Sequence, residues 1–428
     1  MKRVRQEKGV RSLCPADTFS TAEMTLRSLL VDFNSYFASV EQQVEPRLRG
    51  RPVGVVPMMA DTTVCIAASI EAKTFGVKTG TKVGDAKKLC PGIELVLARH
   101  EVYIDFHHRA VAAVDTVVPV REVLSIDEMD CELTGRWREP ERALGLARKV
   151  KETLRGAVGE CLRTSIGIGP NTFIAKTASD MMKPDGLVLI EQRELPRRLF
   201  GLALRDLSGV GKQMEKRLLR HGIRTVEDLC SRTREELRAV WGGVGGEIMH
   251  DRLRGEAVAA REGDTRSISH SSVLAPERRN PADALAILDR LVQKAAMRLR
   301  KSGHYASRIT VALRYLDGSR WDADMRLVDT QDTVLFLHAL EKLWAGRPKD
   351  RRTILQVGMA FSDLVSEAGH TGSLFAAESK SKSLYETLDR LNARFGRQAV
   401  YFASAHKARD RGGMHIAFNH IPDPETEQ

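Results

Sequence analysis

The chain has 428 residues, 42% of them hydrophobic, which is too long for one average domain and predicts roughly two to four. Its formal net charge of +11 predicts attraction to a polyanion, which could be nucleic acid, acidic lipid or an acidic protein. The six cysteines form no C-x-x-C pair, and no apolar run approaches the ~20 residues of a membrane span, so we expect a cytoplasmic protein without zinc ribbons, disulfides or membrane insertion.

The first part of the chain alternates strands and helices. After a basic extension over residues 1–25, an apolar run predicts a strand that ends at Asp32 and Phe33, followed by a helix through Gln43. The later pattern gives a β-α-β-β-α-β order with these elements: paired strands around residues 127 and 128, a helix over 139–157, a strand over 163–168 and a helix over 171–182. An insert over about 41–99, rich in glycine and proline turns, predicts a small subdomain mounted on the sheet.

Between residues 195 and 255 the sequence becomes helical with glycine-rich turns. The segment 207–212 precedes a predicted helix over 213–221 and resembles a helix-hairpin-helix motif, which presents backbone amides to a phosphate. The candidate DNA contacts of this motif are Gly209, Gly211, Lys212 and Lys216. A second turn over 241–246 predicts a less clear repeat. For both turns, an ordinary helix connection that uses glycine remains the alternative.

A polar stretch over 261–267 predicts a linker to another β-α-β-β-α-β unit. Its expected elements are a helix over 281–301, a strand over 308–315, a strand through about 328, a helix over 332–344 and a strand over 353–361. Arg308 and Arg314 share one face of their strand with Thr310 and Ala312, which predicts a small basic platform. A merely solvated sheet face is the alternative.

Three carboxylates carry the predicted chemistry. Asp32, Asp127 and Glu128 lie among strand-forming apolar residues, where an unpaired carboxylate is costly unless it binds cations. Oxygen ligands suit hard divalent ions, so the three acids predict a site for two of them, which would activate a 3′-hydroxyl and neutralise a triphosphate. The backbone carbonyl of Phe33 is a further candidate ligand.

Together, these motifs resemble the Y-family translesion DNA polymerases of the DinB/UmuC, DNA polymerase IV-like type, from about residue 26 to about residue 375. The matching segments are 30–41 and 125–128 for the two catalytic motifs, 71–77 for the fingers, and 165–176 with 183–186 for the end of the palm. The resemblance implies an α+β, multi-domain right hand. Its expected parts are a ferredoxin-like palm (26–40 and 100–190), small fingers (41–99), a helix-hairpin-helix thumb (191–260), a linker (261–267), a little finger (268–368) and a tail (369–428).

The resemblance also implies roles for single residues. Asp32, Asp127, Glu128 and the Phe33 carbonyl would hold two Mg²⁺ ions, and Phe37 would act as a steric gate against the 2′-hydroxyl of a ribonucleotide. The contacts to the incoming triphosphate would come from Lys73, Lys176 and backbone amides near Tyr36 and Phe37. Without the resemblance, Phe37 could be core packing and Lys176 a solvated helix lysine.

Three positions in the fingers motif depart from the family pattern. Relatives often have Thr, Tyr and Arg where this chain has Ala67, Ile70 and Lys73. Lysine offers a point charge in place of a bidentate fork, and isoleucine offers no donor. We therefore expect a weaker or rearranged grip on the triphosphate.

The resemblance implies a template-directed, distributive and error-prone DNA polymerase of the SOS response, a mutator that binds primer–template DNA and dNTPs as a monomer. Ser373, Leu374 and Phe375 fall where relatives carry a sliding-clamp peptide, with an ordinary loop as the alternative. One alternative function is a weak or inactive adaptor of the same fold that recruits another polymerase; the altered fingers favour it and the three intact acids oppose it. A metal-dependent nuclease is another alternative function, but a nuclease would not need the adjacent aromatic residues Tyr36 and Phe37.

Overall fold

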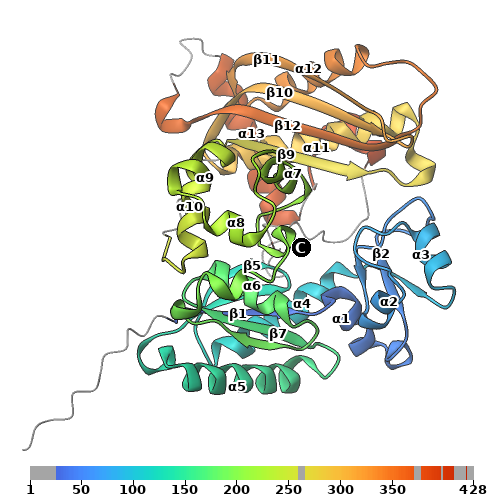
Figure 1. The fold of residues 1–428 in the computed structure, drawn as a ribbon. Coiled ribbons are helices and arrows are strands. Elements are labelled where there is room, and N and C mark those ends of the chain that lie inside the picture. Colours follow the sequence, from blue (N-terminus) through green and yellow to red (C-terminus); the bar gives the residue numbers. More distant parts are fainter. Residues whose placement is uncertain (1–25, 259–265, 371–376, 397–398, 409–420, 422–428) are drawn as a thin grey trace, which may run out of the picture.

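The computed structural model describes residues 26–258, 266–370, 377–396, 399–408 and 421. Figure 1 shows two sheet-and-helix units, at the bottom and top of the view, with a helical unit between them and a small insert beside the lower sheet. We call these the first sheet unit, the helical unit, the second sheet unit and the insert. No helix in the described ranges is both long and apolar enough to cross a membrane.

The first sheet unit contains a five-stranded sheet in the order β5-β6-β1-β7-β8. Its strands are β1 (Ser28–Phe33), β5 (Val120–Ser125), β6 (Glu128–Glu132), β7 (Thr164–Gly169) and β8 (Leu187–Leu189). Helices α4 (His100–Asp115) and α5 (Pro140–Val158) pack against each other in the main apolar core, and α6 (Thr172–Met181) lies against β7 and β1. This order agrees with the predicted one.

A glycine in β7 determines how closely α6 approaches the sheet. A Cβ atom added at Gly167 would lie 1.9 Å from the carbonyl oxygen of Ala175 in α6, so no other residue fits there without moving the helix. Gly167 pairs with Leu30 of β1, and two positions further toward the end of β1 Asp32 pairs with Ser165. The close approach therefore places α6 directly over the end of β1 that carries Asp32.

The insert follows α1 (Tyr36–Val44) and has its own small sheet, in the order β3-β2-β4. Its elements are β2 (Val53–Val56), β3 (Ala67–Ala68), α2 (Ile70–Thr74), α3 (Val83–Leu89) and β4 (Glu94–Leu97). A separate core of buried residues that includes Val56, Ala68 and Val83 holds these elements together. The insert is therefore a small subdomain with its own core and sheet.

The helical unit consists of α7 (Lys212–Arg220), α8 (Val226–Cys230), α9 (Arg234–Trp241) and α10 (Val244–Leu253). Its apolar core continues into the first sheet unit through Phe173, Ile174 and Ala178 of α6, so the two units share one core. Gly209 has a φ of +85°, which glycine adopts without strain. The stretch before this turn is a short 3-10 helix and not a regular helix, whereas the second glycine turn joins two regular helices, α9 and α10.

The second sheet unit has four antiparallel strands in the order β11-β10-β12-β9, with α11 and α12 in its core. Its elements are β9 (Ser267–Val273), α11 (Pro281–Lys301), β10 (His304–Tyr315), β11 (Arg320–Thr330), α12 (Thr333–Ala345) and β12 (Ile354–Ser366). The predicted β-α-β-β-α-β order is present. Its first strand begins at Ser267, the last residue of the predicted linker.

Part of the predicted tail packs onto the second sheet unit. In α13 (Ala377–Phe395), Asp389 makes two hydrogen bonds of 2.7 and 2.9 Å with Arg300 of α11, and the Tyr385 hydroxyl donates to Asp332 at 2.6 Å. A short 3-10 helix, Ala403–Ala408, follows and also packs against α11. The packed unit therefore extends beyond residue 368, the boundary that the sequence suggested.

Candidate active site

Three acidic residues meet at one end of the ladder between β1 and β6. Asp32 is only 2% exposed, and β6 places Glu128 directly opposite it. Asp127 lies in the two-residue turn that joins β5 to β6, and its carbonyl accepts a hydrogen bond of 2.9 Å from the Phe33 amide. The structure thus brings the three predicted acids to one sheet edge, with Asp127 on a turn and not inside an apolar strand as the sequence suggested.

Two lysines form ion pairs with Asp32, and one of them also pairs with Glu128. The Lys176 Nζ, from α6, lies 2.5 Å from Asp32 Oδ2 and 2.9 Å from Glu128 Oε1. The Lys183 Nζ lies 2.7 Å from the same Asp32 oxygen. Burial lowers the pKa of Lys176, but Asp32 and Glu128 raise it by more, so the net shift is upward and the ammonium stays charged. Lys183 belongs to the segment 183–186 that resembles the end of the palm, but it was not predicted as a site residue.

The remaining acids also require positive charge nearby. Burial raises the pKa of Asp127, and the hydrogen bond with the Ser125 hydroxyl offsets part of that rise. Burial also raises the pKa of Glu128, and the positive charge of Lys176 offsets part of that rise. Three carboxylates are suitable donors for divalent cations, so the residues fit such ions in kind. As they stand, Lys176 bridges Asp32 and Glu128, and within the described ranges no three His, Cys, Asp or Glu side chains are grouped to hold a metal ion.

The aromatic pair after β1 has two different environments. The Phe37 ring is half-buried and stacks on Tyr103 of α4, with ring centroids 4.5 Å apart and planes 20° apart. Tyr36 is buried and donates its hydroxyl to the Tyr103 carbonyl at 2.7 Å, so its side chain belongs to the core. The Tyr103 hydroxyl donates to the buried Glu41 carboxylate at 2.7 Å, and Glu41 also pairs with Arg99. These hydrogen bonds hold Tyr103, the ring on which Phe37 stacks.

The insert brings one more lysine to the acids. Partial desolvation lowers the pKa of the Lys73 ammonium and Lys183 acts in the same direction, while Asp32 and Asp127 oppose the shift. Lys73 is therefore within electrostatic range of the acids although it belongs to another sheet. Ala67 is buried in β3 and Ile70 begins α2, so neither of these two positions offers a side-chain donor to a ligand.

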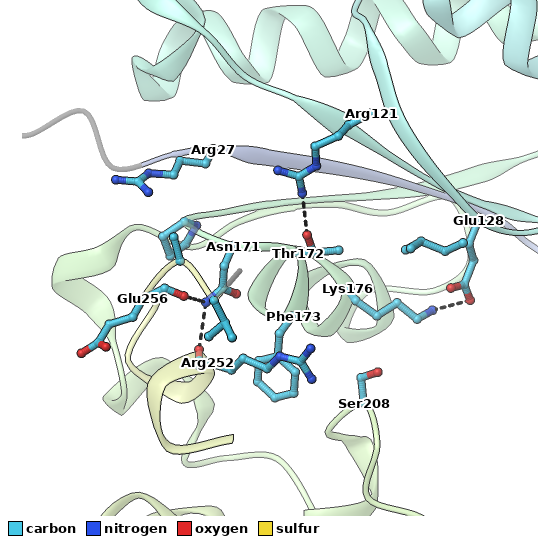
Figure 2. A pocket seen from close by; sticks show the side chains of 14 residues that line it. Arg27, Arg121, Glu128, Asn171, Thr172, Phe173, Lys176, Ser208, Arg252 and Glu256 are labelled. Carbon is cyan, nitrogen blue, oxygen red and sulfur yellow. Dashed lines mark hydrogen bonds and ion pairs between the residues drawn. The ribbon is translucent and has the colours of Figure 1, made fainter. Parts of the chain in front are cut away.

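A cleft of about 370 Å³ lies between the first sheet unit and the helical unit (Figure 2). Four basic side chains and two acidic ones line it: Arg27, Arg121, Lys176, Arg252, Glu128 and Glu256. Ser208, in the first glycine turn, lines the same cleft as the catalytic candidate Glu128. The cleft thus connects the acids with the predicted helix-hairpin-helix turn through a mostly basic surface.

A buried acid holds one of these arginines. Asp130 is fully buried on β6 and accepts hydrogen bonds from Ser28 Oγ, from Thr172 Oγ1 at 3.0 Å and from Arg121, with which it forms an ion pair. The Arg121 guanidinium also donates to Thr172 at 2.7 Å, as Figure 2 shows. The sequence offered only a weak signal for Asp130, which lies two residues after Glu128 and hence on the same strand face, and the prediction left it out.

Asn171 joins the two units that line the cleft, the first sheet unit and the helical unit. Its Oδ1 caps α6 by accepting from the Ile174 amide at 2.8 Å. Its Nδ2 donates to the carbonyls of Arg252 and Glu256 at the end of the helical unit, at 3.1 and 2.9 Å (Figure 2). One side chain therefore connects the helix that carries Lys176 to the helical unit.

Two of the candidate DNA contacts, Lys212 and Lys216, lie on the helix that follows the first glycine turn. Lys212 is the first residue of α7, and both it and Lys216 are exposed. Gly211, at the helix start, has an ordinary φ of −81° and open space around it, so only Gly209 requires glycine for its backbone conformation.

The exposed face of β10 is less basic than predicted. The alternation is present, but Arg308 lies 2.5 Å from Asp324 of β11 and 3.0 Å from Asp363 of β12. The register places Asp324 opposite Thr310 and Asp322 opposite Ala312, so acids from the neighbouring strand share this face. Acidic residues of the two neighbouring strands therefore offset the charge of Arg308, and the sequence of its own strand did not show these partners. Arg314 pairs in register with Arg320.

The predicted clamp peptide, Ser373, Leu374 and Phe375, lies outside the described residues, as does the basic extension over 1–25.

Comparisons with known proteins place these features in a family. The impB/mucB/samB family model matches residues 31–180, the model of its C-terminal domain matches 265–374, and a SAM-like helix-hairpin-helix tandem matches 201–248. The tandem includes both glycine turns and confirms the helix-hairpin-helix prediction.

Among curated proteins, DNA polymerase IV of Moorella thermoacetica is 32% identical over 386 residues, covering 88% of this chain and 95% of that protein. DNA polymerase IV of Pelotomaculum thermopropionicum is 32% identical over 403 residues, covering 90% and 98%. Among solved structures, a Y-family DNA polymerase chimera of Dbh and Dpo4 has a TM-score of 0.65 at 24% identity, covering 79% of this chain and 99% of the chimera. This last likeness concerns the fold.

Proposed function

The chain belongs to the impB/mucB/samB family of Y-family, DinB-type DNA polymerases, and on that premise we propose that it is a translesion DNA polymerase that extends primers past damaged template bases. The reaction joins a dNTP to the primer 3′-hydroxyl and releases pyrophosphate. The observation that carries the proposal is the meeting of Asp32, Asp127 and Glu128 at one sheet edge beneath Lys176. The curated relatives give no support to the inactive adaptor, which the altered fingers residues favour and the three intact acids oppose.

In this proposal the first sheet unit is the palm, the insert the fingers, the helical unit the thumb and the second sheet unit the little finger. The match of the tandem helix-hairpin-helix model to residues 201–248 supports the thumb, and the match of the C-terminal family model to 265–374 supports the little finger. We further propose a cytoplasmic, monomeric protein that reaches a sliding clamp through Ser373, Leu374 and Phe375.

The acids would hold the catalytic ions, which we propose to be two Mg²⁺. Asp32, Asp127, Glu128 and the Phe33 carbonyl are the donors, and the bound ions would supply the charge that activates the 3′-hydroxyl and neutralises the triphosphate. In the described structure Lys176 performs part of that neutralisation through its contacts with Asp32 and Glu128. We propose that, when bound ions neutralise Asp32 and Glu128, Lys176 turns its ammonium from these acids to a phosphate of the nucleotide.

Phe37 would set the choice of sugar. Its ring is fixed against Tyr103 and cannot swing away freely, so a 2′-hydroxyl placed over it would meet a rigid surface. Lys73, Lys176 and Lys183 gather near the same acids and form a cationic pocket suited to a triphosphate. Because Lys73 provides a point charge and no fork, it would hold that triphosphate less firmly than arginine.

The primer strand would occupy the cleft of Figure 2. Arg27, Arg121 and Arg252 line it together with Glu128 and Ser208, so a strand whose 3′ end reaches the acids has cations beside its phosphates. The backbone amides near Gly209 and Gly211, with Lys212 and Lys216, would hold the duplex further on. Arg308 and Arg314 would contribute from the second sheet unit, with Arg308 weakened by its acid partners.

A primer-extension assay with Mg²⁺ and a labelled primer–template tests the proposal. We expect dNTP-dependent elongation by the wild type, on damaged as well as intact templates, and none by Asp127→Ala. If the wild type fails to elongate, or if Asp127→Ala is as active, the proposal is wrong. Shortening of the labelled DNA in place of extension would instead identify a nuclease.

A further inference from the structure

The turn that carries Asp127 lacks the backbone conformation that usually stabilises a two-residue hairpin. Such hairpins favour type I′ or II′ turns, which need a positive φ at one or both central residues. Among the described residues, positive φ values outside glycine occur at Ser35, Asp185 and Asp363, and neither Ile126 nor Asp127 is among them. The β5–β6 register is also irregular just before the turn, between Val123 and Ser125. Within the turn, Ser125 Oγ donates to the Asp127 carboxylate at 2.5 Å and accepts from the Asp127 amide at 3.4 Å, and further contacts come from other elements.

Two hydrogen bonds from other elements hold the peptide groups of the turn. The Phe33 amide donates to the Asp127 carbonyl at 2.9 Å, and His107 Nδ1 lies 2.8 Å from the Ile126 carbonyl oxygen. His107 comes from α4, far from the turn in sequence, and is 3% exposed. One of these bonds is made by the backbone of any residue, whereas the other requires a particular side chain.

The chemistry of His107 agrees with a donor role. Burial lowers its pKa to about 4, so the ring is neutral near neutral pH and carries one proton. Because a carbonyl can only accept, that proton is on Nδ1. The neighbouring His108 is exposed on the same helix and, within the part of the chain that the structure describes, forms no hydrogen bond with the turn.

We propose that His107 is a positioning residue for the polymerase reaction: by donating to the Ile126 carbonyl it fixes the β5–β6 turn, and so sets where the Asp127 carboxylate can meet a divalent cation. The inference rests on the proposed function. His107 touches no reacting atom and acts through the turn alone. A small displacement of a metal-binding carboxylate lowers the rate strongly, since catalysis depends on positions fixed to within about 0.5 Å.

A matched set of substitutions separates positioning from simple core stability. In His107→Asn, the side-chain amide places a donor where Nδ1 was, whereas in His107→Gln the same amide is displaced by one methylene. His107→Phe keeps the ring volume without a donor. His108→Ala is the control for change on the exposed side of α4. The Asn and Gln variants keep the test decisive even if the Phe variant does not fold.

Two measurements are made on the full chain below the melting temperature of each variant. Single-turnover dNTP incorporation gives the rate and the apparent affinities for dNTP and DNA. Electron paramagnetic resonance of free Mn²⁺ gives metal binding directly, with a dideoxy-terminated primer and a dNTP present so that no reaction occurs.

We expect His107→Asn and His108→Ala to stay within about twofold of the wild type. His107→Gln and His107→Phe should lose at least about tenfold in rate and bind Mn²⁺ several-fold more weakly, with little change in DNA affinity. Wild-type rate and Mn²⁺ affinity in the Gln variant, or equal losses in the Asn and Gln variants, would overturn the proposal. If the wild type itself does not extend primers, the proposed function fails, while the Mn²⁺ titration still decides the role of His107.

Discussion

The two sheet units have the same β-α-β-β-α-β order, yet their charged side chains lie in different environments, one partly desolvated and the other open to water. In the first unit α6 covers the acids, so Asp32 is 2% exposed and its contacts with Lys176 and Lys183 lie in a partly desolvated site. In the second unit, Arg308 pairs with Asp324 and Asp363 on an open face. Exposed pairs are screened by water and contribute little, whereas a buried charge must be compensated. The comparison teaches that burial, and not the order of elements, concentrates chemistry in the first unit.

The largest expected effect comes from removing an acid in the first unit. Glu128→Gln keeps the shape of the side chain but removes a charge from a site that has to hold cations, so incorporation should fall by about 1,000-fold or more. Arg308→Ala, in the second unit, should change the same rate by no more than a few-fold. Single-turnover incorporation with saturating DNA measures both. Comparable losses in the two variants would remove the contrast between the units.

The next effect concerns sugar choice in the first unit. Phe37→Ala removes the ring that stacks on Tyr103 and should lower the preference for dNTPs over ribonucleotides by about 100-fold. Tyr36→Phe is the matched control, because it removes a hydroxyl from a neighbouring ring that lies in the core. Incorporation of each nucleotide by the two variants gives the selectivity. An unchanged preference in Phe37→Ala would exclude the gate.

Acid should destabilise both units, through buried His107 in the first and partly buried His270 in the second. Burial lowers the pKa of His107, in the first unit, and of His270, in the second, to about 4. Because the unfolded chain binds protons near pH 6.5 and the folded chain does so only near pH 4, stability decreases as the pH falls through that window, by up to about 3 kcal/mol for fully buried His107. His270→Phe should flatten the pH dependence of denaturant unfolding between pH 6.5 and 4. An identical pH profile in that variant would show that His270 does not titrate as described.

The smallest expected effect concerns the contributions of the two sheet units to DNA binding. Asp324→Asn should free Arg308 for a phosphate and tighten DNA binding by a few-fold, with a steeper salt dependence. Arg27→Met, in the cleft of the first unit, should weaken binding and reduce the salt slope by about one. Fluorescence anisotropy with labelled primer–template at several salt concentrations measures both slopes. Weaker binding by Asp324→Asn would contradict the neutralisation of Arg308.

Local patterns were sufficient to predict several of the strands and helices, including the strand that carries Asp32. The strand ending at Asp32 and the helix over 281–301 appear as expected, because hydrophobic periodicity and helix start signals are properties of neighbouring residues. Strand β9 was not located, since its alternation consists mainly of serine and offers little apolar signal.

Features that depend on long-range pairing could not be predicted. The neutralisation of Arg308 follows from the register between β10 and β11, and the pairing of Arg121 with buried Asp130 also crosses two strands. The contact between His107 and the Ile126 carbonyl joins a helix to a turn that no local pattern connects. In each case the residues were visible but their partners were fixed only by the packed fold.

The central claim is that Asp32, Asp127 and Glu128 form one metal-dependent site for DNA synthesis. Rapid-quench, single-turnover incorporation by the wild type and by Asp32→Asn, over a Mg²⁺ titration, tests it most directly. We predict that the wild type extends the primer only when Mg²⁺ is added, and that Asp32→Asn stays about 1,000-fold slower or more at every Mg²⁺ concentration. Extension by the wild type without divalent ions, or a variant that matches its rate, would contradict the claim.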